Sequence, residues 1–343
     1  MTVLGPQPAA DIPAPLLAVE QLHVHFPMAT SWPWQTGSAL RAVNGIDLSL
    51  AAGRTLGVVG ESGCGKSTLA RAITGLQPIT SGRLTFEGRD VTDLNQAGWR
   101  RLRRDVQMVF QDPLASLNPR MTIGEVVAEP LRHLFPGLSR AERWDRVTAM
   151  LERVGLSGHM VNRYPHEFSG GQCQRIGIAR ALVVQPRLLV CDEPVSALDV
   201  SIQAQILDLL QALQDEFNIA MLFIAHDLAV VRQISDEVLV MYLGQAMEAA
   251  DPDTLFDRPH HPYTRALISA VPRPDPDFER TRKRILLEGD LPSPADPPSG
   301  CVFRTRCPWV QRDCAETVPE RRPRSDGRGE VACHYADELA RAS

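Results

Sequence analysis

The feature that most constrains this chain is the string Gly60-Glu61-Ser62-Gly63-Cys64-Gly65-Lys66-Ser67, which fits the pattern GxxxxGK[ST]. A short apolar segment typical of a strand, Thr55–Val59, precedes it, and a segment with helical spacing, Lys66–Leu76, follows it. Glycines let backbone N–H groups curl around phosphate oxygens, and the N-terminus of the following helix adds a partial positive charge. The alternative is a glycine-rich turn with a chance lysine, and the strand and helix on either side argue against it. The string therefore predicts a phosphate-binding loop in an α/β fold.

The side chains at the end of this loop are predicted to contact a nucleotide and its metal ion. Lys66 is expected to reach the β- and γ-phosphates, Ser67 to bind Mg²⁺, and Thr68 to bond the α-phosphate. We therefore predict that ATP binds along the loop residues Gly60, Ser62, Gly63, Cys64, Gly65, Lys66, Ser67 and Thr68.

A second strand-like segment, Leu188–Cys191, ends in two carboxylates, Asp192 and Glu193. Asp192 is placed to hold the shell of the Mg²⁺ ion, and Glu193 is then placed to orient or polarise the attacking water. Alone, this pattern is equally typical of solvated acids at a strand end. Together with the phosphate loop, it predicts a nucleotide hydrolase.

Composition excludes several other classes of protein. The chain has 343 residues, 44% of them hydrophobic, which is enough for a sizeable core. Its net charge of −5 argues against nucleic acid as a partner, so the arginines at 100, 101, 103 and 104 are interpreted as a solvated helix face. The sequence lacks the pattern of a signal peptide, and its longest strongly apolar run, Ile219–Ala225, is far shorter than the ~18 residues that span a bilayer. We expect a cytoplasmic chain unless another subunit holds it at a membrane.

The remaining periodicity predicts how the chain is organised. Residues 1–15 form a loose lead-in, and strand-like segments cover Leu16–Phe26 and Ala42–Leu50. The pattern is mostly helical over about 113–168, and an amphipathic helix is predicted at Ile202–Phe217. Strands Ile219–Ala225 and Glu237–Tyr242 complete the α/β layout. Prolines then multiply between 272 and 298, and we place a domain boundary near 250.

One further string narrows the family. Phe168-Ser169-Gly170-Gly171-Gln172 lies about 20 residues before the acidic pair, and at this distance from a phosphate loop the chain resembles ABC ATPases over nearly its whole length. The family signature normally starts with Leu, where this chain has Phe168. The resemblance implies a RecA-like core with an antiparallel β subdomain and an α-helical subdomain. It also implies that Ser169, Gly170, Gly171 and Gln172 bind the γ-phosphate held by a second subunit.

Other positions match the family in order. By resemblance, Gln111 senses Mg²⁺ and water, Ser196-Ala197-Leu198-Asp199 communicates across the dimer, and His226 contacts the γ-phosphate. Each has a plainer interpretation: a strand-end amide, a helix N-cap at Asp199, and a structural histidine. Phe26 is expected to stack on adenine, although an aromatic residue at a strand end is more often part of a core.

The resemblance implies a mechanism in which ATP joins the phosphate loop of one subunit to the signature of the other. Closure builds a dry site where Glu193 and His226 position the water, and hydrolysis releases the dimer. The helical segment about 113–168 would carry this motion to membrane-spanning partners. All motifs are intact, so this half-site is expected to be catalytic.

Three strings indicate the transporter group. GESGCGKST at 60–68, YPHEFSGGQCQRIGIARAL at 164–182 and PHHPYTRAL at 259–267 together resemble the ATPases of dipeptide/oligopeptide importers. The last belongs to a C-terminal extension of that group, here 251–343. Residues 38–50 and 116–124 resemble the F-type subunit more than the D-type, which implies a D-type partner in a heterodimer. The group also implies two permease subunits, a periplasmic binding protein acting indirectly, and a place on the cytoplasmic side of the inner membrane.

Four of the seven cysteines crowd into the last 43 residues, with the spacing C-x5-C-x6-C-x18-C: Cys301, Cys307, Cys314 and Cys333. In a reducing compartment such a cluster favours metal over disulfides. The importer resemblance implies a [4Fe–4S] cluster, which four thiolates match. Zinc is the alternative, although its Cys₄ sites usually contain tighter C-x₂₋₄-C pairs. Four unligated thiols are the third interpretation.

Several other functions of ABC ATPases compete with peptide import. An ABC ATPase of a nickel or glutathione importer remains open, because cargo is chosen by other subunits. ABC ATPases of DNA repair carry long insertions between the motif halves, and those of translation carry two cassettes, neither of which this sequence has. Relatives in phosphonate metabolism typically lack the HPY string and the four cysteines. A scaffold with a dead site is disfavoured by intact Lys66, Asp192, Glu193 and His226.

Overall fold

The computed structural model describes residues 15–28, 39–272, 280 and 284–341, and all but the last residue of the predicted lead-in at 1–15 lies outside them. Its strands form two sheets. The first is antiparallel, in the order β2-β1-β4-β5: β1 (Leu17–Pro27), β2 (Ala39–Leu50), β4 (Ser81–Phe86) and β5 (Arg89–Asp90). It corresponds to the antiparallel subdomain that the family resemblance implied.

The second sheet has the order β11-β12-β10-β9-β3-β8-β7-β6 among the described residues. Its strands from β9 to β6 run parallel, and β10, β12 and β11 continue the sheet antiparallel. The strands are β3 (Thr55–Val59), β6 (Val106–Val109), β7 (Leu188–Asp192), β8 (Ala220–Ile224), β9 (Glu237–Tyr242), β10 (Gln245–Ala250), β11 (Arg322–Pro323) and β12 (Glu330–Val331). The residues of β3, β7 and β8 are buried throughout, as expected for strands covered on both faces.

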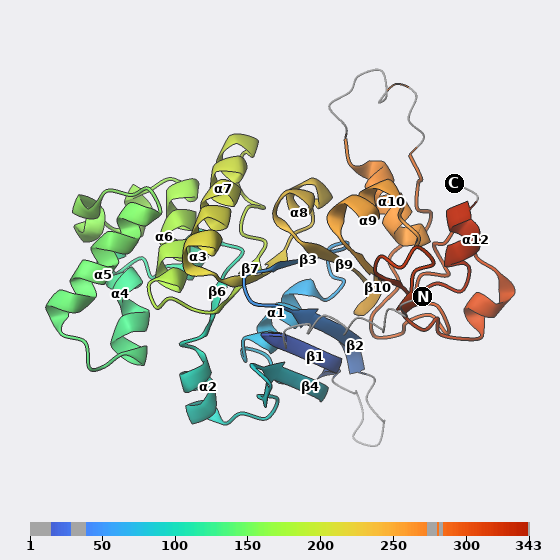
Figure 1. Cartoon of the computed structure of the whole chain (residues 1–343), viewed down its shortest axis with the longest axis horizontal. Coiled ribbons are helices and arrows are strands. Elements are labelled where there is room, and N and C mark those ends of the chain that lie inside the picture. Colours follow the sequence, from blue (N-terminus) through green and yellow to red (C-terminus); the bar gives the residue numbers. More distant parts are fainter. Residues whose placement is uncertain (1–14, 29–38, 273–279, 281–283, 342–343) are drawn as a thin grey trace, which may run out of the picture.

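Helices cover both faces of this second sheet (Figure 1). The helices of the described residues are α1 (Lys66–Ile73), α2 (Gln96–Leu102), α3 (Pro113–Ser116), α4 (Ile123–Leu134), α5 (Arg140–Arg153), α6 (Gly170–Leu182), α7 (Val200–Phe217), α8 (Leu228–Ile234), α9 (Pro252–Asp257), α10 (Pro262–Ala270) and α12 (Ala336–Arg341), with 3₁₀ turns η1 (Gly158–Asn162), η2 (Pro165–Glu167) and η3 (Arg312–Ala315). Within the described residues, no helix is both long and apolar enough to cross a membrane.

Helix α1 lies between the two sheets. Its buried side chains Leu69, Ala70 and Ile73 belong to one core cluster together with residues of β1, β2, β3 and β8. This packing fixes the helix that follows the phosphate loop. The predicted helix extends to Leu76, but α1 ends at Ile73, because Gly75 adopts a left-handed backbone with φ +67°.

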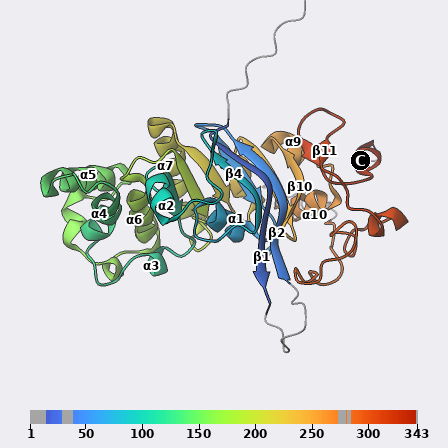
Figure 2. The ribbon, with the colours of Figure 1, turned by 90° about the horizontal axis from the view of Figure 1, so that it is seen from below.

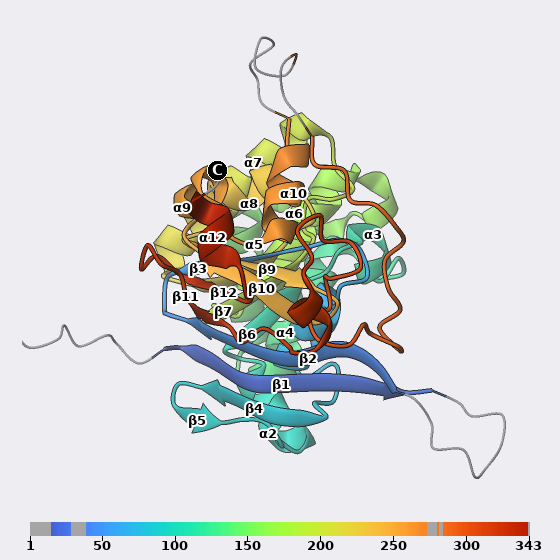
Figure 3. The same ribbon diagram turned by 90° about the vertical axis from the view of Figure 1, so that its right-hand side faces the viewer.

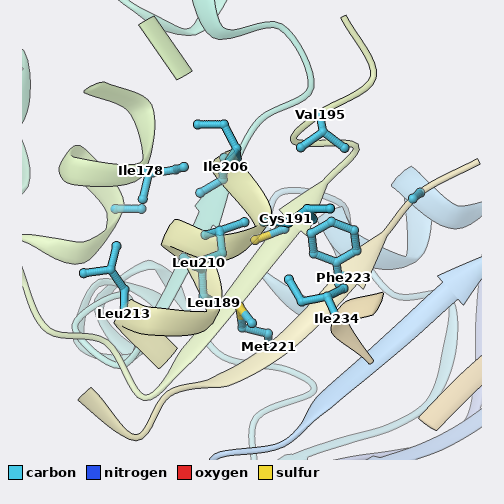
Figure 4. Close-up of a cluster of buried hydrophobic side chains, with 14 of the residues drawn as sticks. Ile178, Leu189, Cys191, Val195, Ile206, Leu210, Leu213, Met221, Phe223 and Ile234 are labelled. Atoms are coloured by element: carbon cyan, nitrogen blue, oxygen red, sulfur yellow. The ribbon is translucent and has the colours of Figure 1, made fainter. Parts of the chain in front are cut away.

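Helix α7 covers the opposite face of the sheet, close to the acidic strand end. Figure 4 shows its apolar side chains Ile206, Leu210 and Leu213 beside residues of β7 and β8: Leu189, Cys191, Met221 and Phe223. Each fully buried leucine or isoleucine contributes roughly 1.5–3 kcal/mol. The predicted amphipathic helix is confirmed, and Asp199 begins it as N-cap by accepting a hydrogen bond from the Ile202 backbone N–H.

The helices of the region 113–182 and the C-terminal segment lie at opposite ends of the molecule (Figures 1 and 2). Capping boxes begin α4 at Thr122 and α5 at Ser139. At the other end β12 pairs with β10, so residues after 250 continue the main sheet, as Figure 3 shows. Phe303 and Tyr263 from this segment belong to the core cluster that also contains Val59 and Tyr242. Residues before and after the predicted domain boundary near 250 therefore share one hydrophobic core. The boundary itself stays a prediction from the change in sequence composition.

Candidate active site

The phosphate loop leaves the carboxyl end of β3, at the centre of the main sheet. Gly60 and Gly65 have φ of +155° and +105°. A Cβ on Gly60 would lie 2.2 Å from the Met241 carbonyl oxygen, and one on Gly65 would lie 2.0 Å from that of Ala42. Both glycines are thus required by close approach of neighbouring backbone as well as by conformation.

Lys66 folds back over the loop that precedes it. Its ammonium group donates to the carbonyl oxygens of Gly60 at 2.8 Å and Glu61 at 3.0 Å, and its side chain is buried. The predicted loop residue Cys64 is also buried, with its sulfur 3.7 Å from the same ammonium, and burial raises the pKa of its thiol. Cys64 therefore contributes backbone and packing to the loop, whereas Lys66 holds a charge beside the predicted phosphates.

The two side chains predicted to hold Mg²⁺ meet directly. Ser67 Oγ donates to Asp192 Oδ1 at 2.8 Å, across the gap between α1 and the end of β7. Burial raises the pKa of the Asp192 carboxyl, and the hydrogen bond from Ser67 offsets part of this shift. A hydroxyl and a carboxylate are oxygen donors of the kind that Mg²⁺ prefers, and a bound cation would stabilise the buried charge. These residues fit the ion that the sequence predicts.

The three predicted catalytic side chains converge on one carboxylate oxygen. Glu193 Oε2 accepts from Gln111 Nε2 at 3.0 Å and lies 3.4 Å from His226 Nδ1. Gln111 follows β6, Glu193 follows β7 and His226 follows β8, so adjacent parallel strands deliver all three to one edge. Glu193 has a left-handed backbone with φ +48°, which is costly for this residue type and is typical of functional sites.

Gln111 and Glu193 border an open cavity of about 310 Å³, whereas His226 contacts Glu193 without lining that cavity. It is lined by the predicted residues Phe26, Ser62, Gly63, Gly65, Lys66, Ser67, Thr68, Gln111 and Glu193, and also by Leu40, Ala42 and Pro294. Phe26 is half-buried and both lines the cavity and packs against a core cluster, so its predicted stacking on adenine stays a prediction. Pro294 was missed by the sequence analysis because it lies in the proline-rich segment, and its carbonyl oxygen accepts from the Arg41 backbone N–H at 3.0 Å.

The signature residues lie elsewhere. Ser169 caps α6 and Gln172 completes a capping box with it, while Ser169 and Gly170 are exposed at the surface. Within the part of the chain that the structure describes, the cavity lining includes none of five predicted residues: Ser169, Gly170, Gly171, Gln172 and Asp199. An exposed helix N-terminus outside its own chain's cavity is what binding to a second subunit's nucleotide would require.

The HPY string has a physical role that the sequence analysis did not recognise. His261 Nδ1 accepts from the Tyr263 backbone N–H and caps α10, Pro262 occupies the first turn, and the Tyr263 hydroxyl accepts from the Glu61 backbone N–H at 2.8 Å. From the cysteine-bearing segment, Arg306 pairs with the Glu61 carboxylate at 2.6 Å. The residues after 250 therefore contact the phosphate loop itself.

The four late cysteines line one small cavity, together with Phe303, Trp309 and His334. Burial, together with neighbouring cysteines, raises the pKa of Cys301, that of Cys307 to about 12 and that of Cys333 to about 11. Within the part of the chain that the structure describes, no three His, Cys, Asp or Glu side chains are arranged to hold a single metal ion. The four thiols thus line one cavity, but they do not surround a single point at which one ion could be bound.

Comparison with known proteins identifies the family of this chain. Residues 43–196 match the ABC transporter family model, and residues 247–314 match the model of the oligopeptide/dipeptide transporter C-terminal region. The chain is 59% identical over 328 residues to the oligopeptide transport ATP-binding protein OppF of Salmonella typhimurium, covering 94% of this chain and 97% of that protein. It is 54% identical over 300 residues to the di/tripeptide transport ATP-binding protein DppF of Pseudomonas aeruginosa, covering 88% and 91%.

Solved structures agree with the fold. A dimeric structure of the ATP-binding cassette MJ0796 bound to ADP and phosphate matches with a TM-score of 0.62 and 28% identity, covering 69% of this chain and 98% of that one. CbiO1 from Clostridium perfringens, part of an ABC transporter complex, matches with a TM-score of 0.61 and 30% identity, covering 71% and 91%. The predicted fold class is confirmed, and the chain belongs to the ATP-binding subunits of the oligopeptide/dipeptide family of ABC transporters.

Proposed function

We propose that this chain hydrolyses ATP to drive the uptake of di- and oligopeptides, as the F-type member of an unlike pair of ATPases. The observation that carries the proposal is that Gln111 and His226 both contact Glu193, and that Gln111 and Glu193 line one cavity with Lys66 and Ser67. The relatives named for oligopeptide and di/tripeptide transport support peptides as cargo.

In the proposed reaction, the glycines of the loop and Lys66 bind the β- and γ-phosphates, and Phe26 stacks on the adenine base. Ser67, Asp192 and Gln111 would hold Mg²⁺, which neutralises developing charge on the phosphates when bound. Glu193 accepts a hydrogen bond from a water molecule and orients its oxygen toward the γ-phosphorus. The water's oxygen bonds to phosphorus as the bond to the ADP oxygen breaks, the proton released by the water passes by way of Glu193 to the phosphate formed, and His226 stabilises the separating phosphate.

The proposed partner completes the site. Ser169, Gly170, Gly171, Gln172 and Asp199 are exposed or lie outside this chain's own cavity, so we assign them to the nucleotide held by a D-type ATPase subunit. The helices over about 113–168 would contact two permease subunits on the cytoplasmic side of the inner membrane. A periplasmic binding protein would deliver the peptide to those permeases.

We also propose that Cys301, Cys307, Cys314 and Cys333 hold a [4Fe–4S] cluster. Four thiolates around one zinc ion stand about 3.8 Å apart, because each Zn–S bond is about 2.3 Å long. Thiolates of a four-iron cluster each bind a different iron and stand further apart. The four thiols line one cavity, which supports a shared prosthetic group, and the importer resemblance favours the cluster over zinc.

Transport by the assembled complex tests the proposal. The chain, its D-type partner and the permeases are reconstituted in lipid vesicles, with peptide-loaded binding protein on the side that faces the periplasm. We expect ATP hydrolysis and accumulation of labelled tripeptide, both lost when Lys66→Ala is introduced. Stimulation by nickel or glutathione instead of peptide would contradict peptide import while leaving the ATPase assignment in place.

A further inference from the structure

One residue of the phosphate loop is held from three sides. The Glu61 backbone N–H donates to the Tyr263 hydroxyl at 2.8 Å, its carboxylate pairs with Arg306 at 2.6 Å, and its carbonyl oxygen accepts from Lys66 at 3.0 Å. Tyr263 and Arg306 stand 202 and 245 residues from Glu61 in the sequence. The loop that binds the phosphates is thus fastened to the C-terminal segment.

The two distant partners are themselves firmly placed. Tyr263 is fully buried, with its ring 4.8 Å from that of Tyr242 and 5.3 Å from that of Phe303. Arg306 is 11% exposed and lies one residue before Cys307, with its guanidinium 6.0 Å from the Tyr242 ring centre. A rigid aromatic cluster therefore presents both groups to Glu61.

The charge on Glu61 explains why such contacts matter. A carboxylate in a phosphate loop repels the bound triphosphate, because like charges in a partly buried site interact over several ångströms. Arg306 neutralises this carboxylate, and with the Glu61 side chain 27% exposed the pair is only partly screened by solvent.

We infer that Tyr263 and Arg306 are positioning residues for ATP, acting through Glu61, and that ATP binding and the docking of segment 301–314 onto the loop stabilise each other. The inference rests on ATP binding alone and needs neither the peptide cargo nor the iron–sulfur cluster. Reciprocity follows from linkage: if the docked segment favours ATP, bound ATP favours the docked segment by the same factor.

Substitutions separate this electrostatic role from simple packing. Arg306→Met keeps the aliphatic stem but leaves the Glu61 carboxylate unpaired, so we expect ATP to bind roughly 3- to 10-fold more weakly. Arg306→Lys restores the charge and should recover most of the affinity. Adding Glu61→Gln to Arg306→Met removes the repelling carboxylate, and the double variant should bind ATP nearly as well as Glu61→Gln alone. Tyr263→Phe removes only the hydroxyl that accepts from the loop, and it should also weaken binding.

The measurement is the dissociation constant for Mg²⁺-ATP by titration calorimetry on the full chain, with Arg312→Met as control because that arginine is 96% exposed in the same segment. Hydrogen–deuterium exchange of residues 301–314 is followed with and without ATP, and we expect ATP to slow it in the wild type but not in Arg306→Met. Should Arg306→Met fail to fold, Glu61→Gln still breaks the contact from the loop side and should abolish the ATP effect on exchange. Unchanged affinity in both Arg306→Met and Tyr263→Phe would overturn the inference. So would a double variant in which Arg306→Met weakens ATP binding, relative to Glu61→Gln alone, as much as it does in the wild type.

Discussion

Glu193 and His226 lie 3.4 Å apart, carboxylate oxygen to ring nitrogen, and the same oxygen accepts from Gln111. Side chains from two neighbouring strand ends therefore contact the same oxygen of Glu193. With its left-handed backbone, Glu193 is held at the position from which a carboxylate can orient water.

The first prediction concerns this carboxylate. Glu193→Gln keeps the size of the side chain and one acceptor oxygen, but it replaces the other oxygen with an amide donor and removes the capacity to polarise water. We expect hydrolysis by the reconstituted complex to fall by roughly 10²–10⁴-fold, with ATP affinity nearly unchanged. The control is Glu216→Gln, since Glu216 is paired with Arg153 on the surface and does not line the cavity. Equal hydrolysis rates in the two variants would contradict the assignment of Glu193.

The second prediction follows from the burial of Asp192. Its pKa is raised in the folded protein, so the carboxyl binds a proton more readily there than in the unfolded chain. Its charge therefore lowers stability at neutral pH, and this cost appears as pH rises from near 3.8 through the raised pKa. Asp192→Asn should raise the melting temperature of the nucleotide-free chain by roughly 1–2 °C for each kcal/mol gained, because the entropy of unfolding grows with chain length.

The same variant should lose the benefit of the metal. Mg²⁺-ATP is expected to raise the melting temperature of the wild type strongly and that of Asp192→Asn only weakly, because the charged Mg²⁺ ligand is gone. Scanning calorimetry with and without Mg²⁺-ATP at pH 7.5 measures both effects. A nucleotide-free Asp192→Asn that melts below the wild type would show that its charge does not oppose folding.

Some features of the site could be predicted from the sequence, and others could not. Loop, strand and helix around Lys66 were predictable because glycine spacing and apolar periodicity are local signals, and the strands that precede Gln111, Glu193 and His226 could be placed in the same way. The contacts of Glu61 could not be predicted, because its partners Tyr263 and Arg306 are distant in sequence. No local pattern indicates a salt bridge between residues 245 positions apart.

The short strands at the edges of both sheets were missed for a related reason. β5, β11 and β12 each span two residues, too few to show an alternating pattern. β10 ends in the alanines Ala249 and Ala250, which have low strand propensity and are held there by pairing with β9 and β12. Tertiary contacts rather than local preference determine these elements.

The third prediction concerns the four late cysteines. Chain purified without oxygen should contain about four irons and four sulfides per molecule and absorb visible light, as a Cys₄-ligated cluster requires. Changing Cys301, Cys307, Cys314 and Cys333 to serine should remove both, whereas Cys173→Ser, at a buried cysteine in helix α6, should not. A colourless protein containing one zinc ion would contradict the proposed cluster, and ATP binding should be measurable in either case.

The fourth prediction concerns the attachment of the C-terminal segment to the sheet. Glu248 of β10 is fully buried, and burial raises the pKa of its carboxyl. It accepts from the His260 and His261 backbone N–H groups at 2.8 and 3.0 Å and pairs with Arg324 at 2.9 Å. The charge of Glu248 is therefore stabilised almost entirely by groups that follow residue 250.

Arg324→Met leaves that buried carboxylate without its cation, and removing one partner of a buried pair costs about 3–5 kcal/mol. We expect denaturant unfolding at pH 7.5 to show a loss of this size, and a smaller loss at pH 5, where Glu248 takes up a proton more readily because its pKa is raised. Glu248→Gln combined with Arg324→Met should recover part of the stability, since no charge remains buried. The matched control is Arg322→Met, at an arginine in the same strand region with a side chain 47% exposed and paired with Asp337. A loss for Arg324→Met no larger than that of the control would mean that the segment is held by its aromatic packing around Phe303 rather than by the buried pair.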